Sequence, residues 1–174
     1  MRELYVAFTM DCERIASESP PGGPETWELS ERAISGYCDF LLESDLYPTL
    51  FIVPECAKKH RPLFGTLSRK GVELGLHLHP QSFDKHQYCK YLGEYERDDQ
   101  LRIIGESRRE FTRALGAEPK SFRSGNFSAN DDTFPVLDSL GFLQGSVSDP
   151  GRNAPGFAAT WMGACPDPHW VSGV

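Results

Sequence analysis

Short apolar runs and longer segments with helical periodicity alternate along this chain. The runs have the length of strands, and between them apolar residues recur three and four positions apart, as on one face of a helix. The predicted strands cover residues 4–10, 49–53, 72–79, 121–123 and 141–147. The predicted helices cover residues 30–46, 54–70 with an interruption near Pro62, 98–115 and 131–140, where Asp131 is the expected N-cap.

This order indicates an α/β protein with a parallel sheet and right-handed crossovers, either doubly wound or a (β/α) barrel. The apolar runs at 4–10 and 49–53 are typical of strands covered on both faces. A dinucleotide fold is disfavoured, because Asp-Cys-Glu follows the first strand where a glycine-rich loop would stand. Residues 148–174 show turn signals and no helix pattern, so we expect one domain over 1–174 with an irregular end.

Chemically active side chains follow three of the predicted strands. Asp11 and Glu13 end the first strand. His77 and His79 end the third, and Arg123 ends the fourth. Residues two apart in an extended segment point to the same face, and in parallel α/β folds the carboxyl ends of the strands carry the active site. Paired carboxylates and paired imidazoles at this edge predict a divalent metal site.

Such a set of groups indicates a reaction class. Three oxygen or nitrogen ligands with an open position define a catalytic metal site. A metal there lowers the pKa of a bound water to about 7, and a carboxylate that is not a ligand takes the proton from that water. Arg123 is placed to hold this carboxylate ionised and oriented. The chemistry predicted is metal-assisted hydrolysis of an amide or ester.

The composition of the chain limits which binding partners and which cellular compartment we expect. A net charge of −7 and a pI near 5.2 argue against nucleic acid and anionic membranes, which attract basic surfaces. The five cysteines include no C-x-x-C pair, which favours reduced thiols over a disulfide framework. No export signal or membrane span is visible, so we expect a cytoplasmic protein. The sequence does not define the oligomeric state.

Three motifs together carry a family resemblance. Thr-Met-Asp-Cys-Glu at 9–13, Gly-Leu-His-Leu-His-Pro at 75–80 and Phe-Arg-Ser-Gly-Asn at 122–126 are similar to an acidic, a histidine and an arginine motif. In this combination the chain resembles the polysaccharide deacetylase family (carbohydrate esterase family 4) from about residue 4 to 147. The resemblance implies a distorted (β/α) barrel and a metal-dependent hydrolase that removes acetyl groups from amino sugars. The implied cofactor is Zn²⁺, or another divalent metal such as Co²⁺, Ni²⁺ or Mn²⁺.

The resemblance also implies roles for individual residues. Asp11 takes the role of general base and Arg123 tethers it. Glu13 and His77 take the roles of metal ligands. The sugar would lie among polar and aromatic side chains near the site, with Asn126, Tyr88 and Trp27 as the predicted substrate-binding residues.

The chain departs from the family's pattern at the metal site. The family's second histidine lies four residues after the first, where this chain has Gln81. We predict His79 as the replacement ligand, with His86 in reserve. The family's second acid directly follows the first, where this chain has Cys12. A thiolate at that position is a possible zinc ligand, but we expect the Cys12 side chain to face away from Asp11.

The late motifs of the family are not recognisable. His169 is the one late histidine and the candidate general acid, and Trp161 is the candidate for a tryptophan-bearing segment. Five predicted strands are fewer than such barrels have, so we expect an incomplete barrel, in a truncated chain or a shortened relative. Two alternatives to a sugar deacetylase stay open. One is hydrolysis of a non-sugar amide, such as a ureide or cyclic imide, and the other is a non-catalytic metal- or carbohydrate-binding relative.

Overall fold

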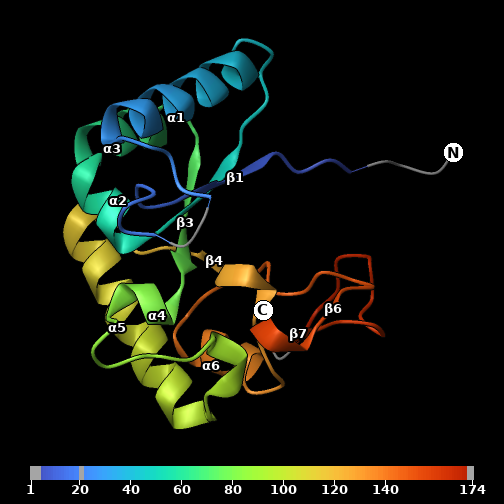
Figure 1. Cartoon of the computed structure of the whole chain (residues 1–174). Coiled ribbons are helices and arrows are strands. Elements are labelled where there is room, and N and C mark those ends of the chain that lie inside the picture. The colour runs from blue at the N-terminus through green and yellow to red at the C-terminus, as the bar shows by residue number, and fades with distance from the viewer. Residues whose placement is uncertain (1–4, 20–21, 172–174) are drawn as a thin grey trace, which may run out of the picture.

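The computed structural model describes residues 5–19 and 22–171 and has one main sheet flanked by helices (Figure 1). The main sheet is formed by β1 (Thr9–Cys12), β2 (Thr49–Ile52), β3 (Glu73–Leu78), β4 (Ser121–Ser124) and β5 (Gln144–Gly145). The helices are α1 (Trp27–Leu42), α2 (Pro54–Lys59), α3 (Arg61–Arg69), α4 (Pro80–Phe83), α5 (Arg97–Leu115) and α6 (Thr133–Ser139). Short 3₁₀ helices are η1 (Leu92–Glu94), η2 (Gly125–Phe127) and η3 (Pro155–Phe157).

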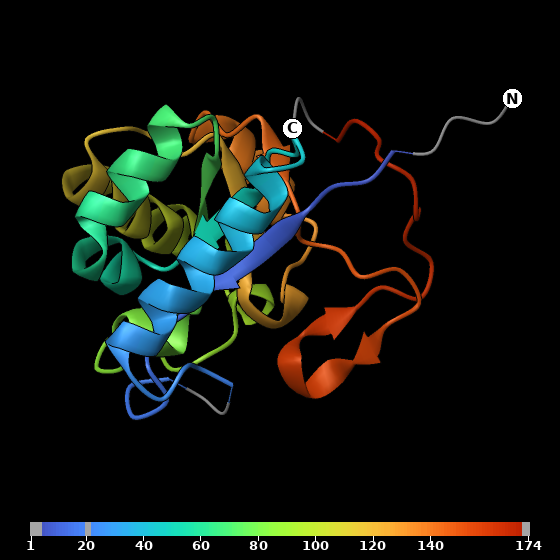
Figure 2. The same ribbon diagram turned by 90° about the horizontal axis from the view of Figure 1, so that it is seen from above.

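The sheet is parallel, and its strands lie side by side in the order in which the chain forms them, β1-β2-β3-β4-β5. The views in Figures 1 and 2 place α1, α2, α3 and α5 together on one side of this sheet. Unreversed strand order with helices on one side is the winding of a barrel, whereas a doubly wound sheet reverses and carries helices on both sides. The predicted fold class is confirmed: the chain is a parallel α/β structure of barrel type, and the barrel is not closed.

The apolar face of each strand packs against the helices. Leu50, Ile52, Leu76 and Phe122 are fully buried there, and helix α5 contributes apolar side chains to the same core. The opposite face of the strands carries polar side chains that include the predicted site residues. The expectation of a strand covered on both faces is wrong for β1, where Asp11 is exposed, whereas in β2 Leu50, Phe51 and Ile52 are all buried.

The two outer strands are shorter than predicted. The first was expected over 4–10, but β1 begins at Thr9, where its pairing with Thr49 of β2 begins. Tyr5 and Val6 are 83% and 62% exposed. The fifth was expected over 141–147, but β5 has only two residues, because the ladder to β4 ends there.

The predicted helices form to within four residues of the expected bounds, but the N-cap of α6 is Asp132 rather than Asp131, and the short helix α4 was not predicted. The break near Pro62 falls at His60, which separates α2 from α3. Helix α5 ends at Gly116, which has the left-handed conformation (φ 74°) that favours glycine at this cap. No helix in the described part of the chain combines the length and the apolar character needed to span a bilayer.

The segment after residue 148 is more ordered than expected. It forms a hairpin of β6 (Asn153–Ala154) and β7 (Ala159–Thr160), joined through η3. The strands of this hairpin are antiparallel and separate from the main sheet. Figures 1 and 2 place it on the side of the sheet opposite the layer of helices. No α-helix forms in the described residues 149–171, as the turn signals indicated.

Candidate metal centre

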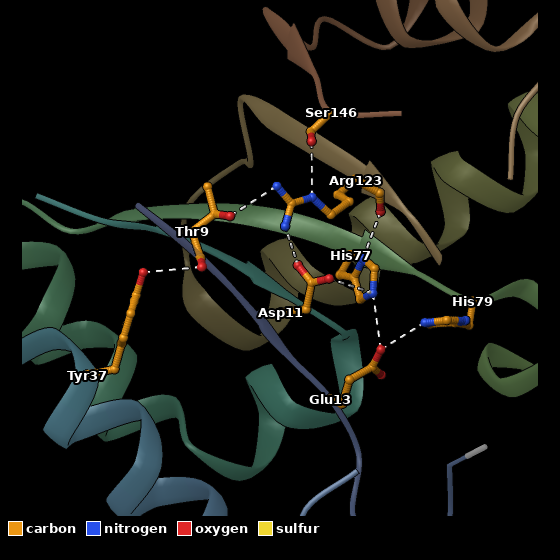
Figure 3. Close-up of polar contacts among 8 residues, drawn as sticks. All are labelled: Thr9, Asp11, Glu13, Tyr37, His77, His79, Arg123 and Ser146. Carbon is orange, nitrogen blue, oxygen red and sulfur yellow. Dashed lines mark hydrogen bonds and ion pairs between the residues drawn. The ribbon is translucent and has the colours of Figure 1, made fainter. Parts of the chain in front are cut away.

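The carboxyl ends of β1, β3 and β4 meet on the polar face of the sheet. His77 of β3 stands directly opposite Arg123 of β4 in the ladder. Asp11 lies on β1, which is separated from β3 by β2, and Phe51 of β2 stands beside Asp11 in the ladder. Glu13 follows β1, and its side chain extends toward the two histidines, as Figure 3 shows.

Three side chains converge on one point. Nε2 of His77 lies 3.1 Å and Nε2 of His79 lies 2.8 Å from the same oxygen, Oε1 of Glu13. One nitrogen or oxygen atom from each of the three residues lies within 4.8 Å of the others. His77 and His79 are buried, and Glu13 is half-buried. Two imidazoles and a carboxylate at this spacing are a donor set for a divalent cation.

The backbone orients His77 toward this point. Its Nδ1–H donates to the carbonyl oxygen of Arg123 at 2.9 Å. Histidines that bind metals through one ring nitrogen usually donate the other N–H in this way, which fixes the tautomer and the ring orientation. The ring nitrogen left for a ligand bond is therefore Nε2, which faces Glu13.

The protonation of the cluster reflects its burial and its contacts. Burial alone raises the pKa of Glu13, but hydrogen bonds from His77 and His79 outweigh it and bring this pKa well below the usual carboxyl range. Burial alone lowers the pKa of His77, but its hydrogen bond to Glu13 and the charge of Asp11 outweigh it and raise this pKa. An ionised carboxylate thus pairs with positive charge at this point, the charge that a cation would supply.

An ion pair lies beside the cluster. Nη1 of Arg123 donates to Oδ1 of Asp11 at 2.7 Å, and the other oxygen of Asp11 faces Nε2 of His77 at 3.9 Å. The guanidinium also donates to the hydroxyls of Thr9 and Ser146, at 3.2 Å and 3.1 Å. Arg123 therefore fixes one oxygen of Asp11 and leaves the other turned toward the cluster.

The guanidinium lies on an aromatic ring. The Cζ of Arg123 is 4.1 Å from the ring centroid of Phe51, within the range of a cation–π contact. Phe51 stands opposite Gly75 in the ladder, and a Cβ at Gly75 would lie 2.9 Å from the Phe51 ring and 2.5 Å from Oγ of Ser121. Glycine at this position makes room for the ring that supports Arg123.

The residues predicted at the strand ends are brought together. Asp11, Glu13, His77, His79 and Arg123 all take part in the contacts described above. Their assigned roles in catalysis and metal binding stay predictions.

Two alternative ligands lie elsewhere. Cys12 is 2% exposed, and burial together with the neighbouring Cys56 and Cys38 raises the pKa of its thiol. This agrees with the expectation that its side chain faces away from Asp11. His86, the reserve ligand, is exposed and does not belong to the cluster.

Other predicted site residues lie in different surroundings. Tyr88 is 1% exposed in the core, and its hydroxyl donates to Glu106. A ring covered on all sides offers no face to a sugar, so the structure contradicts the prediction for Tyr88. Trp27 stands at the start of α1, with its ring against His60 and Lys59. The prediction that Trp27 binds substrate gains no support from these contacts.

Two further predictions concern loops. His169 is exposed, and its ring nitrogen contacts the backbone oxygen of Asp167. Among the described residues, the histidines in contact with the cluster are His77 and His79, so the structure gives His169 no contact there. Asn126 lies in η2, the turn that directly follows β4.

Sequence reasoning missed the supports of Arg123. Thr9 shares the face of Asp11 by the same two-residue spacing, which is a signal the sequence does contain. Ser146 follows the last strand of the sheet, at the edge where the other site residues lie. The role of Gly75 depends on a partner in β2 and has no local signal.

The cluster fits a divalent metal on its own geometry. Oε2 of Glu13 and Nδ1 of His79 are buried and have no hydrogen-bond partner among the residues that the structure describes. Buried polar atoms usually have partners, and the second oxygen of a carboxylate whose first oxygen contacts both histidines is a group that a bound cation would satisfy. The donor set of two imidazoles and one carboxylate matches the ligands that zinc and similar metals take.

Fold and site together define a class: a singly wound parallel α/β protein with a two-histidine, one-carboxylate centre at the carboxyl edge of its sheet. A family model described as "Polysaccharide deacetylase" matches residues 24–145, more than half of the chain. The chain therefore belongs to the polysaccharide deacetylase family, and the resemblance read from the three motifs is confirmed. The match includes both histidines and Arg123, while Asp11 and Glu13 precede it. No curated protein matches the chain.

Solved structures share the fold at low sequence identity. A family 4 carbohydrate esterase from Streptomyces lividans is 16% identical to this chain with a TM-score of 0.55. The match covers 80% of this chain and 60% of the esterase. A protein from Mycobacterium smegmatis classed with the polysaccharide deacetylases is 21% identical with a TM-score of 0.61, and covers 82% and 50%. A pseudoenzyme of the same family from Bacillus anthracis is 12% identical with a TM-score of 0.57, and covers 80% and 41%. The chain thus spans about half the length of these structures.

Proposed function

We propose that this protein is a divalent-metal-dependent hydrolase that removes an acetyl group from an N-acetylated sugar or a polysaccharide precursor. Family membership supports deacetylation of a carbohydrate. The observation that carries the proposal is the convergence of both Nε2 atoms on Glu13, with the Asp11–Arg123 pair directly beside them. Zn²⁺ is the proposed metal, and Co²⁺, Ni²⁺ and Mn²⁺ suit the same donors.

The residues of the metal centre have separate roles in the proposed hydrolysis. Glu13, His77 and His79 would hold the metal. When bound, a divalent metal lowers the pKa of water and polarises the acyl oxygen of the substrate. Asp11 accepts the proton of the attacking water at the oxygen that faces the cluster, and Arg123 holds Asp11 in this orientation through its other oxygen.

Acetate release and metal binding test this proposal together. We expect the chain to bind one metal ion and to release acetate from N-acetylglucosamine or its oligosaccharides. His77→Ala should lose the metal, whereas Asp11→Asn should keep it and lose about 100- to 10,000-fold in rate, the range of general base catalysis. His86→Ala and Asp138→Asn, both at exposed positions, are the matched controls. If Asp11→Asn abolished metal binding, the roles assigned to the two acids would be wrong.

A non-catalytic relative is the second candidate. Two observations favour it. His169, the candidate general acid, makes no contact with the cluster among the described residues, and one of the structures that share the fold is a pseudoenzyme. Metal binding without turnover of acetylated sugars would support this candidate. Turnover of a ureide or cyclic imide alone would instead identify a non-sugar amide as the substrate.

A further inference from the structure

The two histidines of the centre are held by different means. Nδ1 of His77 has the carbonyl of Arg123 as its partner, whereas Nδ1 of His79 is buried without a partner in the described part of the chain. The ring of His79 lies instead against Gly125, where a Cβ would stand only 2.3 Å from Nδ1. Glu13 holds the Nε2 side of this ring, but only packing holds the Nδ1 side, so the position of that side depends on where η2 lies.

The η2 turn has a backbone that needs support. Asn126 and Phe127 have φ values of 58° and 53°, in the left-handed region that residues other than glycine rarely adopt. Such conformations persist where surrounding contacts impose them. Two consecutive residues of this kind, one of them a bulky aromatic, indicate that something outside η2 holds the turn.

The contact that holds η2 comes from the hairpin. The indole Nε1–H of Trp161 donates to the carbonyl oxygen of Phe127 at 2.8 Å. Trp161 is fixed in turn by three backbone hydrogen bonds, one that it donates to Arg152 and two that it accepts from Gly151 and Ala164. The guanidinium of Arg152 lies 5.8 Å from the ring centroid of Phe127, so the hairpin contacts this residue at both its backbone and its side chain.

We propose that Trp161 is a positioning residue for the metal centre: its indole holds η2 in the left-handed conformation, and η2 sets the ring of His79. The proposal rests on the proposed metal site and extends it to a residue that touches neither metal nor substrate. The segment after residue 148 then serves the site through its contacts with η2.

Replacement of Trp161 by phenylalanine removes the N–H and keeps an aromatic ring. Imidazole NMR spectra of the metal-free full chain should show displaced His79 signals in Trp161→Phe and unchanged His77 signals, since His77 keeps its bond to Arg123. Zinc affinity should fall about 10- to 100-fold, the usual effect of losing a group that orients a ligand. Trp170→Phe, at a residue that is 85% exposed, is the matched control. His79 signals like those of the wild type would overturn the proposal.

A reciprocal variant covers the case in which Trp161→Phe does not fold. In His79→Ala, the Trp161 indole N–H resonance should shift, while those of Trp27 and Trp170 stay unchanged. An unshifted Trp161 resonance would contradict the proposal. Because neither NMR readout requires turnover or bound metal, absence of acetate release by the wild type would count against the proposed function alone.

Discussion

Arg123 contributes to the candidate site through both its side chain and its backbone. One guanidinium donates to Asp11, Thr9 and Ser146 and lies on the ring of Phe51. The carbonyl of the same residue accepts from His77. Its backbone thus orients a proposed metal ligand while its side chain orients the proposed base. A planar fork with several fixed donors can do this, whereas an ammonium group cannot.

Replacement of Arg123 by lysine should separate these two functions. Lysine keeps the positive charge and the backbone carbonyl but loses the fork, so Asp11 is no longer held in one orientation. We expect kcat for acetate release to fall about 100-fold, the typical effect of a misplaced catalytic group. Metal affinity should stay within a few-fold of the wild type, because the bond from His77 to the carbonyl remains. Arg113→Lys, at an exposed position, is the control, and loss of metal in Arg123→Lys alone would contradict this division of roles.

Residue spacing predicted much of the site. Two-residue spacing in extended segments placed Asp11 with Glu13 and His77 with His79, and the structure brings all four side chains together. Tyr88 could not be placed in this way, because it lies in a loop without periodicity and its burial depends on Phe83 and Tyr95 from other segments. Local pattern carries information about regular elements and little about how loops fold back.

At the scale of the elements, β3 carries a site residue near its carboxyl end and is tightly packed in its middle. His77 stands near its carboxyl end, and Gly75 stands where the Phe51 ring crosses from β2. The predicted helices agree with the structure to within a few residues because their caps and breaks are local signals. The ends of β1 and β5 were missed, since the length of a strand depends on the partner with which it pairs.

Gly75→Ala should therefore damage both the fold and the site. The added methyl would meet the Phe51 ring and Ser121, and overpacking of this kind costs about 1–3 kcal/mol. Urea denaturation should show this loss, and kcat should fall as the support of Arg123 shifts. In Gly36→Ala, on helix α1, the new methyl meets no atom within 4 Å. This control should be more stable than the wild type by about 0.5–1 kcal/mol, and equal stability of the two variants would contradict the packing argument.

The junction of α2 and α3 should make stability depend on pH. His60 is buried there, with its ring against Trp27 and Phe64 and no partner for Nε2. Burial and the charge of Lys59 lower its pKa, and the charges of Glu31 and Glu28 oppose this shift. The unfolded chain therefore binds a proton more readily, so stability is lost as pH falls below about 6.5 toward the folded pKa.

Thermal unfolding of the metal-free protein between pH 5 and 7 tests this dependence. His60→Phe keeps a ring of similar shape and removes the titrating group. The difference in Tm between wild type and His60→Phe should change with pH. As pH falls, the Tm of the wild type should decrease relative to that of the variant. His86→Phe, at an exposed position, should follow the wild type. A difference that is constant across the range would show that His60 does not titrate differently on folding.

At the scale of the whole molecule, the site exists only because the sheet forms. Asp11 and Arg123 are 112 residues apart in sequence, and Glu13 and His79 are 66 apart. The alternation of strands and helices predicted a parallel sheet whose carboxyl edge brings them together, and the structure confirms that sheet. The hairpin after residue 148 could not be foreseen, because its two-residue strands are shorter than any pattern that periodicity can detect. Its contacts with η2 link the end of the described chain to the centre of the sheet.

The central claim is that Glu13, His77 and His79 hold one divalent ion. X-ray absorption at the zinc edge, on the full chain loaded with Zn²⁺, tests this claim most directly. The account predicts one zinc per chain with two imidazoles and oxygen ligands at about 2.0–2.2 Å, and loss of one imidazole in His79→Ala. A sulfur ligand at about 2.3 Å, or an imidazole count that His77→Ala and His79→Ala leave unchanged, would contradict it.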